Sequence, residues 1–262
     1  MIDYHVHTML CNHARGTMEQ YVDCAVRAGL KEICFLDHLT LNENGLDLSM
    51  TPEEVPLYYY AARRLQAAYK SRIKIKVGLE VDFTPGLSDS ARRTAGQFDF
   101  DVIGGSVHFI GKQNLVSTKG ENAKSRKHDT AFYEDYLNLV DSMLDCDYID
   151  MVCHLDIIKK FGVIPPDWFY TRFEALLDKI AKTDKVLEIN TSGSHHPVGE
   201  IYPSPFLLKE CRKRDIALCT GSDAHLPEQV GRGLEKAADM LKKAGYSQVT
   251  GFNKKTRCPA AI

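Results

Sequence analysis

The chain has 262 residues, of which 44% are hydrophobic and 26% charged, and its formal net charge is −2. This length suits a single α/β barrel domain over residues 1–262, with enough apolar material for a large core. The near-neutral charge argues against recruitment of nucleic acid or of an anionic membrane by a broad electrostatic field. The sequence has no apolar run long enough to cross a bilayer, and its first residues do not resemble a signal peptide.

The eight cysteines include no Cys-x-x-Cys pair. In a chain of this length, the pattern predicts reduced thiols and a cytoplasmic location rather than a disulfide framework. Cys11 and Cys153 lie near the metal-ligand candidates described below, so each is also a candidate soft ligand or neighbour of a ligand. For Cys153, a role as a small core residue is favoured.

The predicted elements alternate between strand and helix along the chain. The expected strands are Ile2–His7, Glu32–Asp37, Ile73–Val81, Phe100–Val107, Tyr148–Cys153, Val186–Asn190 and Ile216–Thr220. The expected helices that follow them are Met18–Ala28, Thr51 through Tyr69, Leu87–Gln97, Phe132–Leu144, Asp167–Ala181, Pro205–Lys213 and Glu228–Ala244. Such repeated units imply parallel strands, and a closed barrel is the commonest way to bury them, with an open doubly wound sheet as the alternative.

Local signals predict some helix ends. Gly29 is expected to end the first helix, because glycine readily takes the left-handed conformation found after a helix. The second helix is expected to begin at Thr51 as the N-cap, with Pro52 at the first position and Glu54 completing a capping box.

Two histidines one residue apart, His5 and His7, lie within the first expected strand. Side chains alternate between the two faces of a strand, so both imidazoles lie on the same face. A pair held in this way can chelate a transition metal, although a single His-x-His motif is weakly specific.

Later strands end in further residues able to bind a metal. They are Asp37 and His38, Glu80, His108, His154, Asn190, and the pair Asp223 and His225. In a parallel barrel these strand ends meet on one face. Their joint occurrence predicts a polynuclear metal site, because any one of these residues taken alone is commoner as a structural side chain.

The mixed imidazole and carboxylate set favours Zn²⁺, Mn²⁺ or Fe²⁺ over Mg²⁺ or Ca²⁺. The number of candidates suffices for two to three divalent ions, and a carboxylate such as Glu80 can bridge a pair. A metal-bridging hydroxide would then be the nucleophile and the cations would neutralise developing charge. Hydrolysis of a phosphate ester matches this arrangement, because its transition state is highly anionic.

These residues resemble the PHP (polymerase and histidinol phosphatase) family, and within it the monofunctional histidinol-phosphate phosphatase type. The motifs that carry the resemblance are Asp3-Tyr4-His5-Val6-His7-Thr8, Cys11-Asn12-His13-Ala14, Leu36-Asp37-His38, Gly78-Leu79-Glu80-Val81-Asp82, Gly105-Ser106-Val107-His108-Phe109, His154-Leu155-Asp156, Glu188-Ile189-Asn190-Thr191-Ser192-Gly193, Gly199-Glu200-Ile201-Tyr202-Pro203-Ser204 and Gly221-Ser222-Asp223-Ala224-His225. The resemblance covers essentially the whole chain. It implies a distorted (β/α)7 TIM-like barrel with a trinuclear metal centre and hydrolysis of L-histidinol phosphate in histidine biosynthesis.

The resemblance also implies the metal ligands, which are His5, His7, His13, His38, Glu80, His108, His154, Asp223 and His225. A bridging pair of ions would use His5, His7, Glu80, His108, His154 and Asp223, and a third ion His13, His38 and His225. Water would attack phosphorus directly, without a covalent enzyme intermediate. The proton for the leaving alkoxide would come from Asp223, His225 or metal-bound water.

The chain departs from the phosphatase pattern in two places. Ser194-His195-His196 stands where a basic run is usual, and Ile110-Gly111-Lys112 follows where a Gly-Trp-like sequence is usual. The segment from Lys112 to His128 is basic, with Lys119, Lys124, Arg126 and Lys127 against Glu121. A solvated loop is its ordinary interpretation, and a phosphate-gripping lid is the functional one.

Other candidate phosphate-binding residues are Arg15, Lys160, His195 and Arg232. For Arg15, Lys160 and Arg232, a plain surface cation is an equally good interpretation. The expected partner is a small phosphorylated metabolite, with neither nucleic acid nor membrane involved, and the sequence leaves the oligomeric state open.

Alternative functions remain open at this point. A PHP phosphoesterase acting on a different phosphorylated metabolite is one, and an amidohydrolase-type C–N hydrolase is a less favoured one, because that family typically has a lysine where this chain has Val107-His108. A proofreading-type nuclease and a non-catalytic metal-binding module are further alternatives. The near-neutral charge offers little support for the nuclease.

Overall fold

The computed structural model describes residues 1–117, 130–163 and 165–262. Its centre is a sheet of seven strands in the order β1-β2-β3-β4-β7-β8-β9. The strands are β1 (Ile2–Val6), β2 (Glu32–Leu39), β3 (Lys74–Asp82), β4 (Val102–Ser106), β7 (Met151–Val152), β8 (Val186–Asn190) and β9 (Leu218–Gly221). Every pairing between neighbours in this order is parallel.

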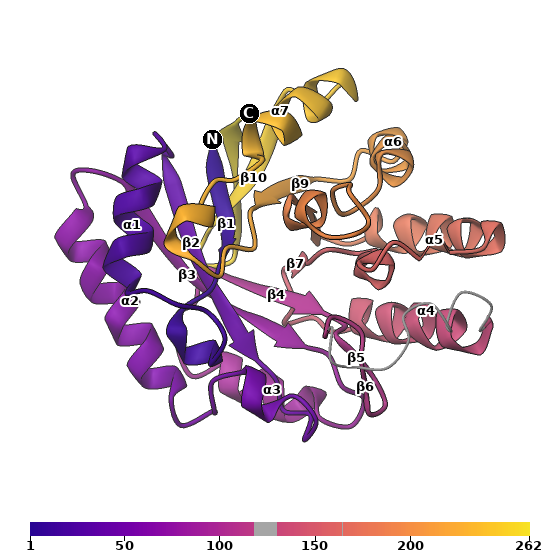
Figure 1. Cartoon of the computed structure of the whole chain (residues 1–262), viewed down its shortest axis with the longest axis horizontal. Coiled ribbons are helices and arrows are strands. Elements are labelled where there is room, and N and C mark those ends of the chain that lie inside the picture. Colours follow the sequence, from indigo (N-terminus) through magenta and orange to yellow (C-terminus); the bar gives the residue numbers. More distant parts are fainter. Residues whose placement is uncertain (118–129, 164) are drawn as a thin grey trace.

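The first and last strands of the sheet approach each other at their carboxyl ends. The His7 N–H donates to the Ala224 carbonyl over 3.0 Å, and the Ala224 N–H donates to the His5 carbonyl over 3.3 Å. The sheet therefore forms a nearly closed barrel, as predicted, and not an open doubly wound sheet (Figure 1).

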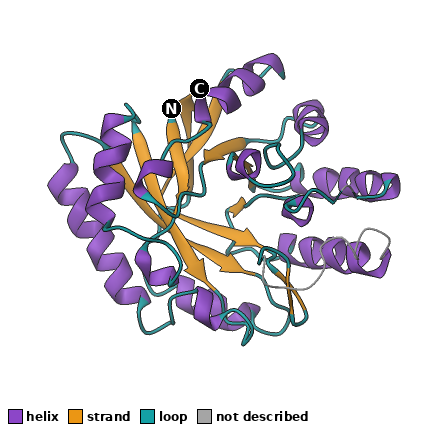
Figure 2. Cartoon of the chain, in the orientation of Figure 1, coloured by secondary structure: helices purple, strands orange, loops and turns teal. Residues whose placement is uncertain are grey.

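Helices surround the strands on the outside of the barrel (Figure 2). They are α1 (Met18–Arg27), α2 (Val55–Tyr69), α3 (Ser88–Ala95), α4 (Thr130–Leu144), α5 (Asp167–Ile180), α6 (Pro205–Lys213) and α7 (Leu234–Lys243). Short 3₁₀ helices occupy the connections, as do two small antiparallel strands, β5 (Phe109–Ile110) and β6 (Gln113–Asn114). Because helices cover the outer face and side chains fill the interior, the barrel strands are buried on both sides.

Two predicted helix starts are wrong. Helix α2 begins at Val55, with Glu54 as its N-cap, and only half of the expected capping box forms, since Glu54 Oε2 accepts the Thr51 N–H over 2.8 Å. Helix α7 begins at Leu234 instead of Glu228, because the backbone at Gly231 and Gly233 has φ of 74° and 83°, which breaks a helix.

A C-terminal hairpin, β10 (Gln248–Asn253) and β11 (Thr256–Ala261), was not predicted. Its turn places Lys254 and Lys255 at φ of 49° and 65°, positions where Asn-Gly or Asp-Gly is the usual signal. The hairpin packs at the amino-terminal end of the barrel, where the Phe252 N–H donates to Tyr4 Oη over 2.7 Å and the Lys255 N–H donates to the Asp101 carbonyl over 2.7 Å. It therefore covers the end of the barrel opposite to the candidate site.

Within the described part of the chain, none of the helices combines the length and the apolar character needed to span a membrane.

Removal of the Phe252 side chain tests whether the hairpin completes the core. This ring is 1% exposed and packs 5.8 Å from the ring of Tyr4. Phe252→Ala is expected to lower the free energy of unfolding by about 3–5 kcal/mol, because it leaves a buried cavity. Urea unfolding followed by circular dichroism measures this change.

The matched control is Arg257→Ala on β11, which removes only an exposed ion pair with Asp184. This change is expected to cost at most about 1 kcal/mol. Equal losses in the two variants would contradict a core role for the hairpin.

Candidate metal centre

The predicted ligands gather at the carboxyl ends of the barrel strands. His5 lies in β1, His38 in β2 and Glu80 in β3, while His108 and His154 each come two residues after a strand end. The remaining ligands, His7, His13, Asp223 and His225, lie on the connections after β1 and β9. The parallel arrangement thus brings all nine candidates to one rim.

Glu80 lies at the centre of this rim and has no solvent exposure. Its Oε1 is 2.8 Å from His154 Nε2 and 3.6 Å from His108 Nε2. Its Oε2 is 2.9 Å from His38 Nδ1 and 3.3 Å from His5 Nε2. One carboxylate therefore contacts imidazoles from four different parts of the barrel, which is the geometry a bridging ligand requires.

Asp223 forms a second point of convergence. Its Oδ1 is 3.1 Å from His7 Nε2 and 3.9 Å from His5 Nε2. Its Oδ2 accepts hydrogen bonds from Ser192 Oγ over 3.1 Å and from Asn190 Nδ2 over 3.3 Å. The carboxylate is thereby held with one oxygen toward the imidazoles.

His13 also joins the group, although its residue is exposed. Its Nδ1 lies 2.7 Å from the Cys11 carbonyl, and its Nε2 lies 3.0 Å from His225 Nε2. His225 in turn has its Nδ1 3.0 Å from the Asp223 carbonyl. Each imidazole is anchored through Nδ1, which leaves the two Nε2 atoms facing each other.

Buried carboxylates support the imidazoles from behind. Glu188 Oε1 is 2.6 Å from His5 Nδ1, and Asp37 Oδ1 is 3.3 Å from His7 Nδ1. Such partners fix the orientation of a ligating histidine and raise its basicity. Sequence reasoning placed Asp37 among the metal-capable strand ends but assigned no role to Glu188, although a glutamate inside an apolar strand is itself a signal.

Two of the proposed ligands have left-handed backbone conformations, which are uncommon for residues other than glycine. His154 has φ of 24° and Asp223 has φ of 57°. Asp3 supports the second of these, because it accepts the Ser222 N–H over 2.8 Å and the Gly231 N–H over 2.8 Å. Unfavourable backbone geometry held by surrounding contacts is typical of functional sites.

The electrostatics favour ionised carboxylates. Burial alone favours the neutral acid, but the surrounding imidazoles, His5 first, outweigh it and hold the pKa of Glu80 well below its usual range. The same balance, with His5 and His7, holds the pKa of Asp223 well below its usual range. Burial and the neighbouring His7 lower the pKa of His38 to about 3, so this imidazole is neutral and has a lone pair to offer.

These residues fit a divalent transition metal. His5 Nε2 and Glu80 Oε2 face each other at the rim, and both are buried and make no hydrogen bond within the described part of the chain. Sets of three residues place their donor atoms within 4.8 Å of one another, and they include His5 with Glu80 and His154, His7 with His38 and His225, His5 with His7 and Asp223, Cys11 with His13 and His225, and His5 with Cys153 and Glu188. Imidazole nitrogen with carboxylate oxygen is the donor set that zinc, manganese and iron accept.

Comparison with known families decides the classification. Residues 3–192 match the PHP domain family, and residues 208–240 match the PHP-associated family. The chain belongs to the PHP family. The family prediction made from the motifs is therefore confirmed.

Several relatives of this PHP protein align over almost its whole length. It is 34% identical over 256 residues to a Deinococcus radiodurans protein named "Probable histidinol-phosphatase", covering 97% of this chain and 98% of the relative. It is 27% identical over 257 residues to the histidinol-phosphatase of Lactococcus lactis, covering 96% and 94%.

A solved structure has the same fold. The histidinol phosphate phosphatase of Lactococcus lactis, complexed with zinc, L-histidinol and phosphate, superimposes with a TM-score of 0.86 at 24% identity, covering 98% of both chains. This likeness confirms the predicted TIM-like barrel.

The candidate phosphate-binding residues of the PHP protein are not equally placed. Lys160 is partly buried, and burial lowers its pKa although the charge of Asp223 acts in the opposite direction. The sequence prediction did not select His196. Burial and then the charge of Lys160 lower the pKa of this histidine, whereas the charge of Asp223 acts to raise it. His195 and Arg232 are both exposed. The pKa of His195 is lowered chiefly by partial burial and to a smaller extent by the charge of Arg232.

Arg15 is the outlier among these candidates. Its N–H donates to the His225 carbonyl over 3.0 Å, but its exposed side chain lines a separate cavity with Asp23 and Glu228, between α1 and the turn Pro227–Gln229. Its role in binding phosphate stays a prediction. Lys112 is exposed, whereas the rest of the basic segment, at Lys119, Glu121, Lys124, Arg126, Lys127 and His128, lies outside the described residues, so the choice between a solvated loop and a phosphate-gripping lid stays open.

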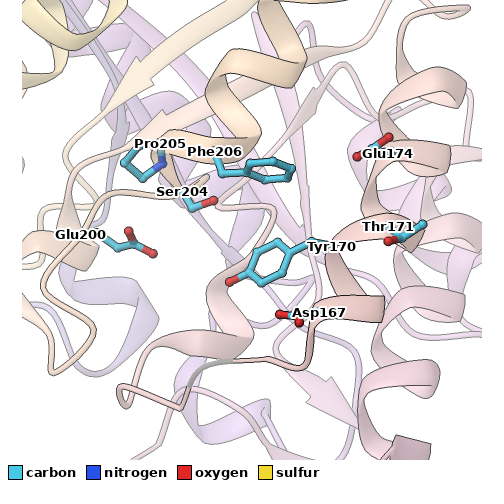
Figure 3. A pocket seen from close by; sticks show the side chains of 8 residues that line it. All are labelled: Asp167, Tyr170, Thr171, Glu174, Glu200, Ser204, Pro205 and Phe206. Atoms are coloured by element: carbon cyan, nitrogen blue, oxygen red, sulfur yellow. The ribbon is translucent and has the colours of Figure 1, made fainter.

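A cavity of about 560 Å³ lies away from the metal centre, between α5 and the start of α6 (Figure 3). Its lining includes Tyr170 and Phe206, with Asp167, Glu174 and Glu200 as acidic groups. None of the nine predicted ligands, all of which lie in the described part of the chain, contributes to it.

The pKa of His196 predicts a dependence of stability on pH. Burial and the Lys160 ammonium hold this pKa at about 4. An unfolded histidine titrates near about 6.5, so between about pH 6.5 and about pH 4 only the unfolded chain takes up the proton, and the free energy of unfolding falls. His196→Gln is expected to make this fall smaller, as measured by urea unfolding at about pH 7 and about pH 5.

His195→Gln is the control, because the neighbouring side chain is exposed and should contribute less to the same fall. If His196→Gln and the parent protein lose equal stability on acidification, then the folded chain does not suppress protonation of His196.

Proposed function

We propose that this PHP protein is a metal-dependent phosphomonoester hydrolase whose substrate is L-histidinol phosphate, which it converts to L-histidinol and phosphate. The observation that carries the proposal is the convergence of buried imidazoles on Glu80, because this donor set is built for several divalent cations. Full-length relatives bear the name histidinol-phosphatase, and one of them was solved with L-histidinol and phosphate.

The proposed ligands are the nine residues named from the sequence, and two to three zinc, manganese or iron ions are the proposed cofactors. A set of this size supplies roughly three protein ligands per ion. When bound, such ions supply a hydroxide nucleophile near neutral pH and neutralise charge on the phosphoryl group. Zinc in the Lactococcus lactis structure supports this choice of metal.

The protein's own contribution is to fix the orientation and the protonation of each donor group. His5 Nδ1 faces Glu188 and His7 Nδ1 faces Asp37. Burial alone would lower the pKa of both imidazoles, but the surrounding carboxylates outweigh it and raise the pKa of both in the metal-free protein. A metal would displace the Nε2 proton, and each imidazole would then keep its Nδ1–H on the carboxylate behind it. The low pKa of Glu80 keeps its two oxygens unprotonated and able to bridge. These orientations are made before substrate binds, which avoids reorganisation during the reaction.

Substrate phosphate would be oriented by Lys160, with His196 beside it as a neutral hydrogen-bonding group. The Lys160 ammonium makes no hydrogen bond or ion pair with another described residue that would compete for a phosphate oxygen. His195 and Arg232 are exposed to solvent, where the charge of Arg232 would attract an incoming phosphate dianion. The leaving alkoxide needs a proton. Asp223 is ionised, and burial with the neighbouring His7 holds the pKa of His225 well below its usual value, so metal-bound water would be the best of the three predicted donors.

Release of inorganic phosphate from a panel of small phosphomonoesters tests the proposed substrate. The protein, supplied with zinc, manganese or iron, is expected to release phosphate from L-histidinol phosphate with a kcat/KM well above that for sugar phosphates and amino acid phosphates. Preference for another member of the panel would keep the phosphatase assignment but replace the substrate. Turnover of cyclic amides alone would favour the amidohydrolase alternative.

Substitution of the two central carboxylates tests the site. Glu80→Gln and Asp223→Asn are each expected to lower kcat by a factor of at least about 10³, because each removes a negative ligand that the metal centre requires. Circular dichroism is expected to show a retained fold.

Glu174→Gln is the matched control, since this carboxylate lines the outer cavity between α5 and α6. It should leave kcat unchanged. Activity close to that of the parent protein in both Glu80→Gln and Asp223→Asn would refute the assignment of the site.

A further inference from the structure

Glu188 on β8 is fully buried and uses both of its oxygens. Oε1 accepts the His5 Nδ1–H over 2.6 Å. Oε2 accepts the His154 backbone N–H over 2.8 Å and a hydrogen bond from Asn190 Nδ2 over 3.1 Å. A single carboxylate thus contacts one ligand candidate on β1 and another after β7, on opposite sides of β8 in the barrel.

We propose that Glu188 is a positioning residue that couples His5 and His154, so that both imidazoles reach Glu80 together. The inference rests on the proposed metal binding at this rim and deepens it, because it names the group that makes two of the ligands act as one unit.

The contact with His5 determines which nitrogen faces the centre. Because Glu188 holds the Nδ1 proton, Nε2 is left as the donor atom, 3.3 Å from Glu80 Oε2. A carboxylate behind a ligating imidazole also raises its basicity, and loss of such a partner typically weakens metal binding by a factor of about 10–100.

The contact with His154 acts through the backbone. His154 has φ of 24°, a conformation that a side-chain-bearing residue rarely adopts without support. The hydrogen bond from its N–H to Glu188 supplies that support. With the backbone held in this way, His154 Nε2 lies 2.8 Å from Glu80 Oε1.

Gly221 on β9 provides the space that Glu188 needs. A Cβ atom at this position would overlap Glu188 Oε1 and would lie 2.5 Å from His5 Cβ. Any side chain here would therefore push the carboxylate away from the imidazole. The arrangement extends over three strands, since β9 makes room, β8 carries the carboxylate and β1 presents the histidine.

Metal affinity is the direct test, measured by competition between the zinc-loaded protein and a chromogenic chelator. Glu188→Gln keeps the shape of the side chain but has one acceptor oxygen in place of two, so it can accept either from His5 or from His154 and Asn190, but not from both sides. It is expected to bind zinc about 10–100 times more weakly. Gly221→Ala is expected to weaken binding in the same direction, through displacement of Glu188.

Asp101→Asn is the matched control. Asp101 is also a buried carboxylate, and it accepts the Val77 and Lys254 N–H groups over 3.1 Å and 3.2 Å at the far end of the barrel. It should leave zinc affinity unchanged. Parent-like zinc affinity in folded Glu188→Gln would overturn the proposal.

A second readout needs no variant. Nitrogen-15 NMR of the zinc-loaded parent protein is expected to show His5 with a protonated Nδ1 and a metal-bound Nε2. Metal binding through Nδ1 would overturn the proposal even if the variants fail to fold. Neither measurement depends on which phosphomonoester is hydrolysed, so failure of the proposed substrate and failure of this inference are distinguishable.

Discussion

The burial of one negative charge, on Glu80, is the constraint on which the rest of the structure depends. An ionised carboxylate without solvent contact is strongly unfavourable unless positive or polar groups surround it. Here the compensation comes from His5, His38, His108 and His154, which belong to different strands or to the connections that follow them. The parallel arrangement of the barrel brings these four imidazoles to one point. The same convergence that makes Glu80 tolerable as a buried group makes the rim a site for cations.

The site is held from behind by groups that do not face it. Glu188 and Asp37 anchor imidazoles through their Nδ1 atoms, and Asp3 holds the connection that carries Asp223. These supports explain how the left-handed backbone of Asp223 persists, since hydrogen bonds to its neighbours outweigh the local strain. A rim assembled in this way is organised before any substrate arrives, which favours catalysis by electrostatic stabilisation over induced rearrangement.

Stability and chemistry occupy opposite ends of the barrel. The hairpin β10–β11 closes the amino-terminal end, where Phe252 packs on Tyr4 and the Lys254 and Lys255 amides bond to Asp101. The carboxyl-terminal end is left for the polar connections that carry the ligands. This division is general for barrels of parallel strands, in which one end can vary for function while the other keeps the core intact.

The order of the predicted strands, helices and motifs along the chain was enough to predict the barrel and the family. It was also enough to predict that the metal-capable residues would gather at one rim. The period of two puts His5 and His7 on one face, and each later strand ends in a residue of the same chemical kind. Contacts between distant segments decided the rest. The use of both Glu188 oxygens and the docking of the C-terminal hairpin join residues far apart in the chain, and no local pattern encodes them. The physical reason is that these hydrogen-bond partners become neighbours in space through the pairing of all seven strands. The sequence around each partner does not contain that information.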